Sequence, residues 1–291
     1  MDVAGIQRAL GKRVERSQSI GGGAAGSVHR LWLDDGTTVV CKIAARGGLD
    51  AEAASLDFLA AHSSLPVPRV LHAARATLVM TDIPGEAGAD GADGHAAAVL
   101  ADLHGQASPD GRFGLAFDNT IGPLPQPNAW AASWVEFYRE RRVLHMARAA
   151  RDEGAIDAGL LRQIESLAAR LGELIPDRPT PSLIHGDVWS GNVLTHAGRV
   201  TGFVDPSPYY AHAEVELAFI DLFSTFGRSF HDAYDAARGT GAHDQREFER
   251  TRRTVYQVYP LLVHARLFRG GYVAQVAGAL SRLGFSGRFV P

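Results

Sequence analysis

Three side chains with oxygen donors stand in one segment whose sequence predicts a loop followed by a hairpin. Four residues separate Asp187 from Asn192, and Asp205 follows an apolar stretch. A β-hairpin over 193–204 would place Asn192 opposite about Phe203 and return Asp205 to its neighbourhood. Carboxylate and carboxamide oxygens suit a hard cation, above all Mg²⁺. The same residue types also cap turns, but their combination with the hairpin favours a Mg²⁺ site.

The D-x4-N spacing is also that of the kinase catalytic loop, in which the Asp accepts the hydroxyl proton and the Asn binds metal. Gly21, Gly22 and Gly23 precede a predicted hairpin, Lys42 lies in a β-rich stretch, and Glu52 lies near the start of a predicted helix. Glycines allow backbone N–H groups to approach phosphate closely, and in kinases a strand Lys pairs with a helix Glu. Each feature alone could be a flexible turn, an edge-strand lysine or a solvated glutamate. Their order along the chain favours a nucleotide site.

The elements that must position these side chains change character at about residue 85. The sequence before it predicts two helices and three strands, and the sequence after it predicts mainly helices. Residues 84–94 are rich in Pro, Gly and Asp and predict a linker. We expect helices over 1–16, 50–62 (with Asp50 as a candidate N-cap), 95–104, 130–154, 157–175 and most of the chain from 213; strands over 28–33, 37–44 and 76–83; and a loop over 106–128.

Composition excludes several classes of protein. The 291 residues are 46% hydrophobic and 21% charged, which are ordinary globular values, and the net charge of −3 argues against a nucleic-acid polycation. Arginine clusters at 139–142 and 250–253 are better interpreted as solvated helix faces. One cysteine, Cys41, excludes a disulfide framework. No secretory signal and no apolar run of about 20 residues is visible, so we expect a cytoplasmic protein without a membrane partner.

Other catalytic chemistries have little support in the sequence. Twelve histidines are scattered along the chain without an H-E-x-x-H motif, which argues against a histidine-bound metal enzyme. No G-x-S-x-G motif for a serine hydrolase is present. His185, beside Asp187, is expected to brace the backbone. Glu216 is expected to brace the same loop.

Over nearly its whole length the chain resembles the fructosamine kinase (ketosamine-3-kinase) family, in the aminoglycoside phosphotransferase and choline kinase branch of the protein-kinase-like fold. The resemblance rests on the glycines, Lys42, LADLHG at 100–105 and HGDVWSGN at 185–192. Two further segments are narrower signatures of the family. They are DNTIGPLPQPNAWAASWVEFYRERR at 118–142 and DPSPYYAHAEVELA at 205–218.

The resemblance implies an α+β, two-lobe fold. Residues 1–85 would form a small β-rich nucleotide-binding lobe with one main helix, and residues 86–291 a larger, mainly helical lobe for catalysis and substrate binding. It also implies ATP and Mg²⁺ and the phosphorylation of the 3-hydroxyl of a ketosamine, the sugar adduct of an amine, with loss of the sugar afterwards. The implied roles are Asp187 as catalytic base, Asn192 and Asp205 as Mg²⁺ ligands, Lys42 and Glu52 as the ion pair that anchors phosphate, Gly21, Gly22 and Gly23 as the loop over the phosphates, and Met80, Thr81, Asp82 and Ile83 as the hinge strand at adenine.

The substrate would be a small or protein-bound ketosamine, which is cationic at neutral pH, so acidic and aromatic side chains are candidates to contact it. Ordinary core packing is the alternative for the aromatic ones. Two alternative functions remain open. The protein could be a kinase for another alcohol, such as an aminoglycoside, choline or methylthioribose, or a catalytically silent nucleotide-binding module. A monomer is expected. The substrate candidates are Asp118, Trp130, Trp134, Tyr209, Tyr210 and Glu214.

Overall fold

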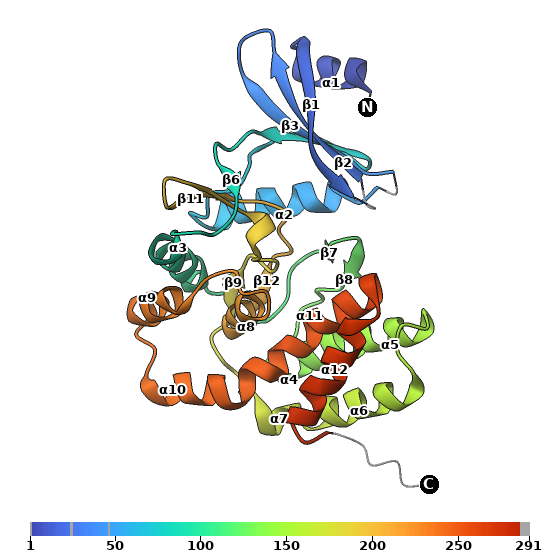
Figure 1. Cartoon of the computed structure of the whole chain (residues 1–291), viewed down its shortest axis with the longest axis vertical. Coiled ribbons are helices and arrows are strands. Elements are labelled where there is room, and N and C mark those ends of the chain that lie inside the picture. Colours follow the sequence, from blue (N-terminus) through green and yellow to red (C-terminus); the bar gives the residue numbers. More distant parts are fainter. Residues whose placement is uncertain (1, 24–25, 46, 286–291) are drawn as a thin grey trace.

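The structure is a computed structural model that describes residues 2–23, 26–45 and 47–285. An N-terminal lobe built on a β-sheet stands above a larger helical lobe (Figure 1). The sheet has five antiparallel strands in the order β1-β2-β3-β5-β4. Its elements are α1 (Val3–Leu10), β1 (Val14–Gly23), β2 (Gly26–Leu33), β3 (Thr38–Ile43), α2 (Leu49–His62), β4 (Val70–Ala74) and β5 (Thr77–Thr81).

Alternate residues of β3 belong to two different hydrophobic clusters of the N-terminal lobe, as the period of a strand requires. Val39 and Cys41 pack with Ile6 of α1. Val40 packs with the cluster that contains residues of α2, and Lys42 lies on the same side of the strand. This alternation directs the Lys42 side chain toward α2.

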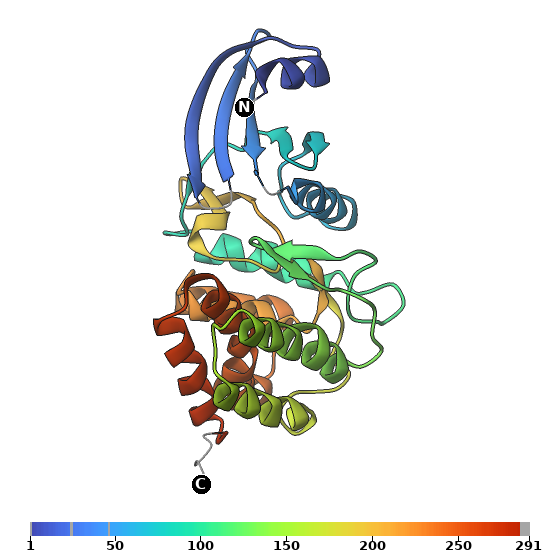
Figure 2. The same cartoon turned by 90° about the vertical axis from the view of Figure 1, so that its right-hand side faces the viewer.

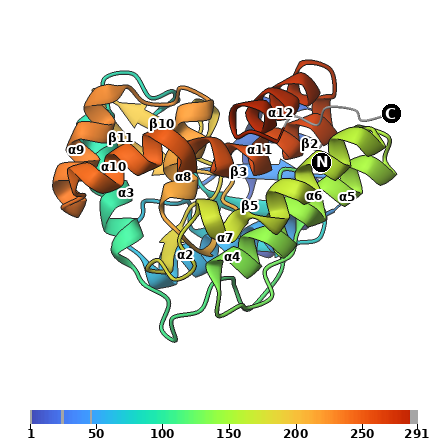
Figure 3. The same cartoon turned by 90° about the horizontal axis from the view of Figure 1, so that it is seen from below.

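The helical lobe contains a core of helices and several short strand pairs. Figure 2 shows these helices stacked beneath the sheet, and Figure 3 shows them from below, with α9 and α10 on one side and α5 and α6 on the other. Its helices are α3 (Asp93–Gly105), α4 (Trp134–Phe137), the π-helix η1 (Tyr138–Leu144), α5 (His145–Asp152), α6 (Ala158–Ala169), α7 (Leu171–Leu174), the 3₁₀-helix η2 (Ser190–Asn192), α8 (Glu214–Leu222), α9 (Arg228–Arg238), α10 (Ala242–Glu247), the π-helix η3 (Phe248–Arg252), α11 (Arg253–Phe268) and α12 (Gly271–Arg282). Its strands are β6 (Glu86–Ala87), β7 (Asn119–Ile121), β8 (Leu124–Gln126), β9 (Ser182–Ile184), β10 (Val193–His196), β11 (Arg199–Phe203) and β12 (Tyr209–Ala211).

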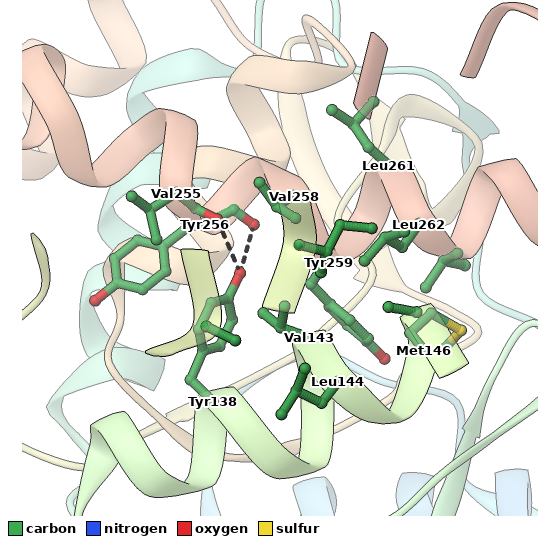
Figure 4. Packing of buried hydrophobic residues seen from close by; sticks show 14 of the residues in the cluster. Tyr138, Val143, Leu144, Met146, Val255, Tyr256, Val258, Tyr259, Leu261 and Leu262 are labelled. Atoms are coloured by element: carbon green, nitrogen blue, oxygen red, sulfur yellow. Dashed lines mark hydrogen bonds between the residues drawn. The ribbon is translucent and has the colours of Figure 1, made fainter. Parts of the chain in front are cut away.

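A proline inside α11 is accommodated by a tyrosine of η1. Pro260 has no N–H, so it leaves the carbonyl of Tyr256, four residues earlier, without its helical partner. The hydroxyl of Tyr138 donates to this carbonyl at 3.0 Å and to that of Val255 at 3.2 Å (Figure 4). Tyr138 and Tyr256 are both fully buried. The bond therefore joins η1 to α11 in the centre of the core.

A hydrophobic cluster extends across the two lobes. Leu59 of α2 and Leu65, which follows that helix, pack with Leu100 of α3 and Phe203 of β11. Helix α2 therefore rests on the helical lobe as well as on the sheet. No described helix is long and apolar enough to cross a membrane.

The observed elements confirm the α+β, two-lobe prediction and correct several expected bounds. The first helix ends at Leu10 rather than at 16, because Gly11 takes a left-handed conformation with φ +64° and closes it. The N-cap of α2 is Gly48, not Asp50. Strands β1 and β4 were not expected, β7 and β8 lie within the expected loop 106–128, and the expected linker contains β6, which pairs with β10. The expected helix over 130–154 starts at Trp134 and becomes a π-helix at Tyr138.

Candidate active site

An ion cluster joins the two lobes at Lys42. The Nζ of Lys42 donates to Oε1 of Glu52 on α2 at 2.7 Å and also to Oδ1 of Asp205 in the helical lobe. The side chains of Lys42 and Glu52 are 10% and 17% exposed, whereas that of Asp205 is 46% exposed. Burial would lower the pKa of Lys42, but the charges of Asp205 and Glu52 outweigh it and raise that pKa. The expected pair of Lys42 and Glu52 is therefore present, with Asp205 as a third member.

The loop that follows β9 brings Asp187 and Asn192 together. The Nδ2 of Asn192 donates to Oδ2 of Asp187 and to its carbonyl oxygen, both at 2.9 Å. Asn192 is almost fully buried, so this side chain has a fixed orientation. The contact holds the Asp187 carboxylate at the start of the β10–β11 hairpin.

The hairpin differs from the expected register by one residue. Val193, not Asn192, pairs with Phe203, because β11 carries one extra residue, Thr201, in a β-bulge. Asn192 instead accepts a hydrogen bond from the N–H of Val204 at 3.0 Å. The next residue, Asp205, has φ +57°, a left-handed conformation that is uncommon outside glycine and that Asp tolerates. The bulge and this turn direct Asp205 toward Lys42.

The site concentrates negative charge. Burial and the neighbouring charge of Asp205 raise the pKa of Asp187 to about 8, although the hydrogen bond from Asn192 acts in the opposite direction. A cation near these two carboxylates would relieve this repulsion. Within 2–23, 26–45 and 47–285, no group of three or more His, Cys, Asp or Glu could hold a metal. Two carboxylates with one carboxamide do fit a cation that takes its remaining ligands from phosphate and water, as Mg²⁺ does.

A buried glutamate braces the loop from behind, as expected for Glu216. Its two carboxylate oxygens accept hydrogen bonds from the N–H of Gly186 at 2.6 Å and of His185 at 3.2 Å. Nε2 of His104 lies 2.9 Å from the same carboxylate, and Nδ1 of His104 lies 2.6 Å from the hydroxyl of Tyr234. Burial alone would raise the pKa of Glu216, but the hydrogen bond and charge of His104 lower it. Glu216 therefore stays ionised while it holds the loop backbone.

Gly186 allows the loop to approach the segment after Asp205. Its φ is +89°, and a Cβ at this position would collide with the carbonyl oxygen of Ser207. The N–H of Ser207 in turn donates to the carbonyl of His185 at 2.8 Å. Only glycine combines this conformation with this close approach.

The residues expected around the nucleotide lie on the N-terminal lobe. Gly21, Gly22 and Gly23 form the end of β1, and Gly21 and Gly22 pair with Val28 and Ser27 of β2. The tip of this hairpin, residues 24–25, lies outside the described residues. The glycines therefore belong to a β-hairpin, the kind of element that covers phosphates in kinases.

The expected hinge divides into two parts. Met80 pairs with Val40 on one side and Val70 on the other, and Thr81 donates its N–H to the carbonyl of Arg69 at 2.9 Å. The backbone of these two residues is therefore engaged within the sheet. Two residues follow the end of β5, where the chain leaves the sheet. They are Asp82, whose carboxylate binds Arg30 at 2.7 Å, and Ile83, whose side chain packs against Gly202.

The four aromatic substrate candidates lie in the helical lobe, and three of them, Trp134, Tyr209 and Tyr210, are buried. Trp134 and Tyr209 are 0% and 1% exposed, and both belong to the main core. Tyr210 is 4% exposed and stacks on Trp130, which also lies 5.1 Å from the guanidinium of Arg112. The rings of Trp134 and Tyr209 present almost no surface to a ligand.

The two acidic candidates are engaged by other groups. Asp118 accepts a hydrogen bond from the N–H of Asn128 at 2.7 Å. Glu214 binds Arg252 through two bonds of 2.6 Å and lines a cavity of about 910 Å³ on the α9–α10 side of α8. Since Glu214 precedes Glu216 by two residues on one helix, their side chains point in different directions. Glu214 therefore faces away from the loop that carries Asp187 and Asn192.

One aromatic residue beside the loop was not among the candidates. Trp189 is 44% exposed, which is unusual for so large an apolar side chain. It lies two residues after Asp187, and its indole packs over Gly191. Its position within HGDVWSGN was the signal that could have identified it.

The sequence of the chain is similar to those of known proteins. The model of the family described as fructosamine kinase matches residues 3–284. A Synechocystis protein named probable ketoamine kinase slr1563 is 37% identical over 59% of this chain and 55% of its own length, and Arabidopsis thaliana protein-ribulosamine 3-kinase is 34% identical over 55% and 47%. The chain thus spans about half the length of these two curated relatives. The probable ketoamine kinase YniA of Escherichia coli (strain K12) is 34% identical over 81% of this chain and 80% of its own.

Solved structures show the same fold. A protein of Thermobifida fusca assigned as a fructosamine-3-kinase superposes with a TM-score of 0.84 at 30% identity, over 97% of both chains. Aminoglycoside phosphotransferase APH(4)-Ia, in a ternary complex with AMP-PNP and hygromycin B, superposes with a TM-score of 0.64 at 16% identity, over 97% of this chain and 96% of its own, and shows the fold alone. The family match, which extends over almost all of the described residues, shows that the chain belongs to the fructosamine kinase family.

Proposed function

We propose that the protein is an ATP-dependent kinase that phosphorylates the 3-hydroxyl of ketosamines, after which the sugar is lost and the amine is freed. The observation that carries this proposal is the ion cluster of Lys42, Glu52 and Asp205 beside the Asp187–Asn192 pair. Phosphoryl transfer depends on positioning and charge neutralisation, which this arrangement can supply. We further propose residues 1–85 and 86–291 as the two functional lobes, in a monomer that acts in the cytoplasm.

In this proposal Lys42 holds the phosphates of ATP. Glu52, on α2, orients the Lys42 ammonium group through their hydrogen bond. The β1–β2 hairpin covers the phosphates with its glycine backbone. The chain after β5, at Asp82 and Ile83, offers backbone groups to adenine. These roles leave the side of the site formed by the helical lobe to the acceptor.

Asp187 orients the sugar hydroxyl and accepts its proton during transfer. Its carboxylate is held by Asn192 at 2.9 Å, so its free oxygen can face the acceptor. Asn192 and Asp205 would hold Mg²⁺, which when bound neutralises charge that develops on the transferred phosphoryl group. Because Asp205 contacts Lys42, the Mg²⁺ ligand and the lysine ammonium are close enough to act on the same phosphates.

The acceptor is a cation, and the site is acidic. Asp205, together with Asp187 once its proton has been released, provides negative charge that attracts the secondary amine of a ketosamine. Trp189 offers an exposed indole on the same loop, on which a sugar ring or the amine can pack. Trp130 is the remaining partly exposed candidate, whereas Trp134 and Tyr209 act through packing of the core.

The test measures ATP consumption by the purified protein with Mg²⁺. The acceptors are ribulosamines, erythrulosamines, fructosamines, aminoglycosides and choline. Turnover of ketosamines that is lost in Asp187→Asn, with nucleotide binding retained, is the expected result. Preferred turnover of an aminoglycoside would refute the proposed substrate. Nucleotide binding without turnover of any acceptor would favour a silent module.

A further inference from the structure

A buried arginine in the helical lobe has no carboxylate partner among the described residues. Arg142 of η1 is 0% exposed, and its guanidinium donates to the carbonyl of Pro127 at 2.7 Å and to Oδ1 of Asn128 at 2.6 Å. The cation also lies 3.9 Å from the ring centroid of Tyr209 and 5.6 Å from that of Tyr259. Burial of a charge is strongly unfavourable unless other groups compensate it. Here aromatic faces and neutral acceptors supply the compensation.

Arg142 donates to the first residue of a buried chain of carboxamide side chains. The Nδ2 of Asn128, whose oxygen accepts from Arg142, donates to Oδ1 of Asn119 at 2.9 Å. The same oxygen accepts from Nε2 of Gln126 at 2.8 Å, and Oε1 of Gln126 accepts from the hydroxyl of Tyr259 at 2.7 Å. Asn119, Gln126 and Asn128 are at most 4% exposed. The network thus fixes which end of each carboxamide is the donor and ties the β7–β8 hairpin to η1 and α11.

The far end of the network reaches the segment after Asp205. The Nδ2 of Asn119 donates to the carbonyl of Pro208 at 2.9 Å, and Nε2 of Gln126 donates to that of Ser207 at 3.2 Å. The hydroxyl of Ser207 donates to the carbonyl of Thr120 at 2.6 Å. On its other side Ser207 donates its N–H to the carbonyl of His185 at 2.8 Å. The segment is therefore clamped between the β7–β8 hairpin and the catalytic loop, two residues away from Asp205.

We infer that Arg142 is a positioning residue for Asp205, which it places through Asn128, Asn119 and Gln126. A neutral side chain could fill this part of the core without the desolvation cost of a charge. It could not, however, donate to two acceptors at once while stacking on an aromatic face. The hydrogen bonds it anchors end on carbonyls at 207 and 208, so they set the position of the turn in which Asp205 takes its left-handed conformation. This inference rests on the proposed role of Asp205 as a Mg²⁺ ligand.

The experiment measures the affinity for AMP-PNP by calorimetry as a function of Mg²⁺ concentration, so it does not depend on turnover. Arg142→Met removes the cation at similar length, and Tyr259→Phe removes only the hydroxyl that donates to Gln126. Tyr138→Phe is the matched control, because it deletes a buried hydrogen bond of the same π-helix that does not touch the network. Melting curves report the fold of each variant.

We expect Arg142→Met to raise the Mg²⁺ concentration for half-maximal binding about 10- to 100-fold, the usual effect of a residue that orients a metal ligand. Tyr259→Phe should shift it in the same direction by less, and Tyr138→Phe should lower the melting temperature without a shift. Wild-type Mg²⁺ dependence in a folded Arg142→Met, or in Tyr259→Phe if Arg142→Met does not fold, would overturn the inference. The inference would also be overturned if the affinity of the wild-type protein for AMP-PNP did not depend on the Mg²⁺ concentration. If the shift occurs but wild type turns over no ketosamine, the inference stands and only the proposed substrate fails.

Discussion

The ion cluster at Lys42 should contribute to the stability of the fold. This contribution can be measured separately from the proposed role of Lys42 in binding nucleotide. Lys42→Met leaves the Glu52 carboxylate, 17% exposed, without its cation. Breaking a buried pair in this way costs about 3–5 kcal/mol. For a chain of this length about 2 °C is lost per kcal/mol, so the melting temperature should fall by about 6–10 °C. Glu52→Gln alone should cost less, since Lys42 keeps Asp205.

The double variant Lys42→Met/Glu52→Gln removes both charges that the N-terminal lobe contributes to the cluster. It should be more stable than Lys42→Met, because replacing both members of a buried pair is often close to neutral. Its kinase activity should nevertheless stay as low as that of Lys42→Met, because the phosphates have lost their cation. Stability would thus be recovered without function.

Differential scanning fluorimetry without nucleotide measures these changes, and ATP consumption measures the activity. Lys12→Met is the matched control, since the pair of Lys12 and Asp35 is 41% and 39% exposed and should be worth less than about 1 kcal/mol. Losses that simply add in the double variant would refute the reasoning, because they would mean that Lys42 and Glu52 do not interact across α2 and β3.

Four further predictions concern the catalytic loop and the groups that hold it. The pKa of Asp187 is raised from 3.8 to about 8, so Mg²⁺–AMP-PNP should release a proton at pH 7, which calorimetry in buffers of different ionisation heat would show. Because the folded state holds this proton more tightly, stability of the free protein should fall from about pH 4 to 8, and an unchanged slope in Asp187→Asn would contradict this. Glu216→Gln should cost about 1–3 kcal/mol and lower kcat, since its amide cannot accept from both His185 and Gly186; wild-type melting would count against the brace. Gly186→Ala should abolish turnover through collision with Ser207, and full activity would rule the close approach out.

The parts of the site that depend on local periodicity could be predicted from the sequence. The alternation of β3 fixes the side of the sheet that Lys42 faces, and one turn into α2 places Glu52 beside it. The D-x4-N spacing similarly brings Asn192 to Asp187 within a single loop. The change from strands to helices at about residue 85 followed from the same periodicity, whereas the two-lobe fold class came from the resemblance to the family.

Other parts could not be predicted because they depend on distant contacts. The bulge at Thr201 shifts the hairpin by one residue, and Gly202 beside it is only a general signal that does not specify which residue is left unpaired. Whether an aromatic side chain is buried depends on elements far away in the chain: Trp134 donates to the hydroxyl of Tyr256, 122 residues later. Strand β1 was missed because its residues are mostly exposed and polar, so they lack the alternation that marks a half-buried strand.

The surroundings of Lys42 also decide its reactivity. A sugar aldehyde adds only to an unprotonated, accessible amine. Lys42 is 8% exposed, and the carboxylates of Asp205 and Glu52 keep its amine protonated. Its electron pair is therefore withheld from carbonyl compounds. With 27 arginines and a single other lysine, Lys12, the chain offers few side chains to the very modification that its family acts upon.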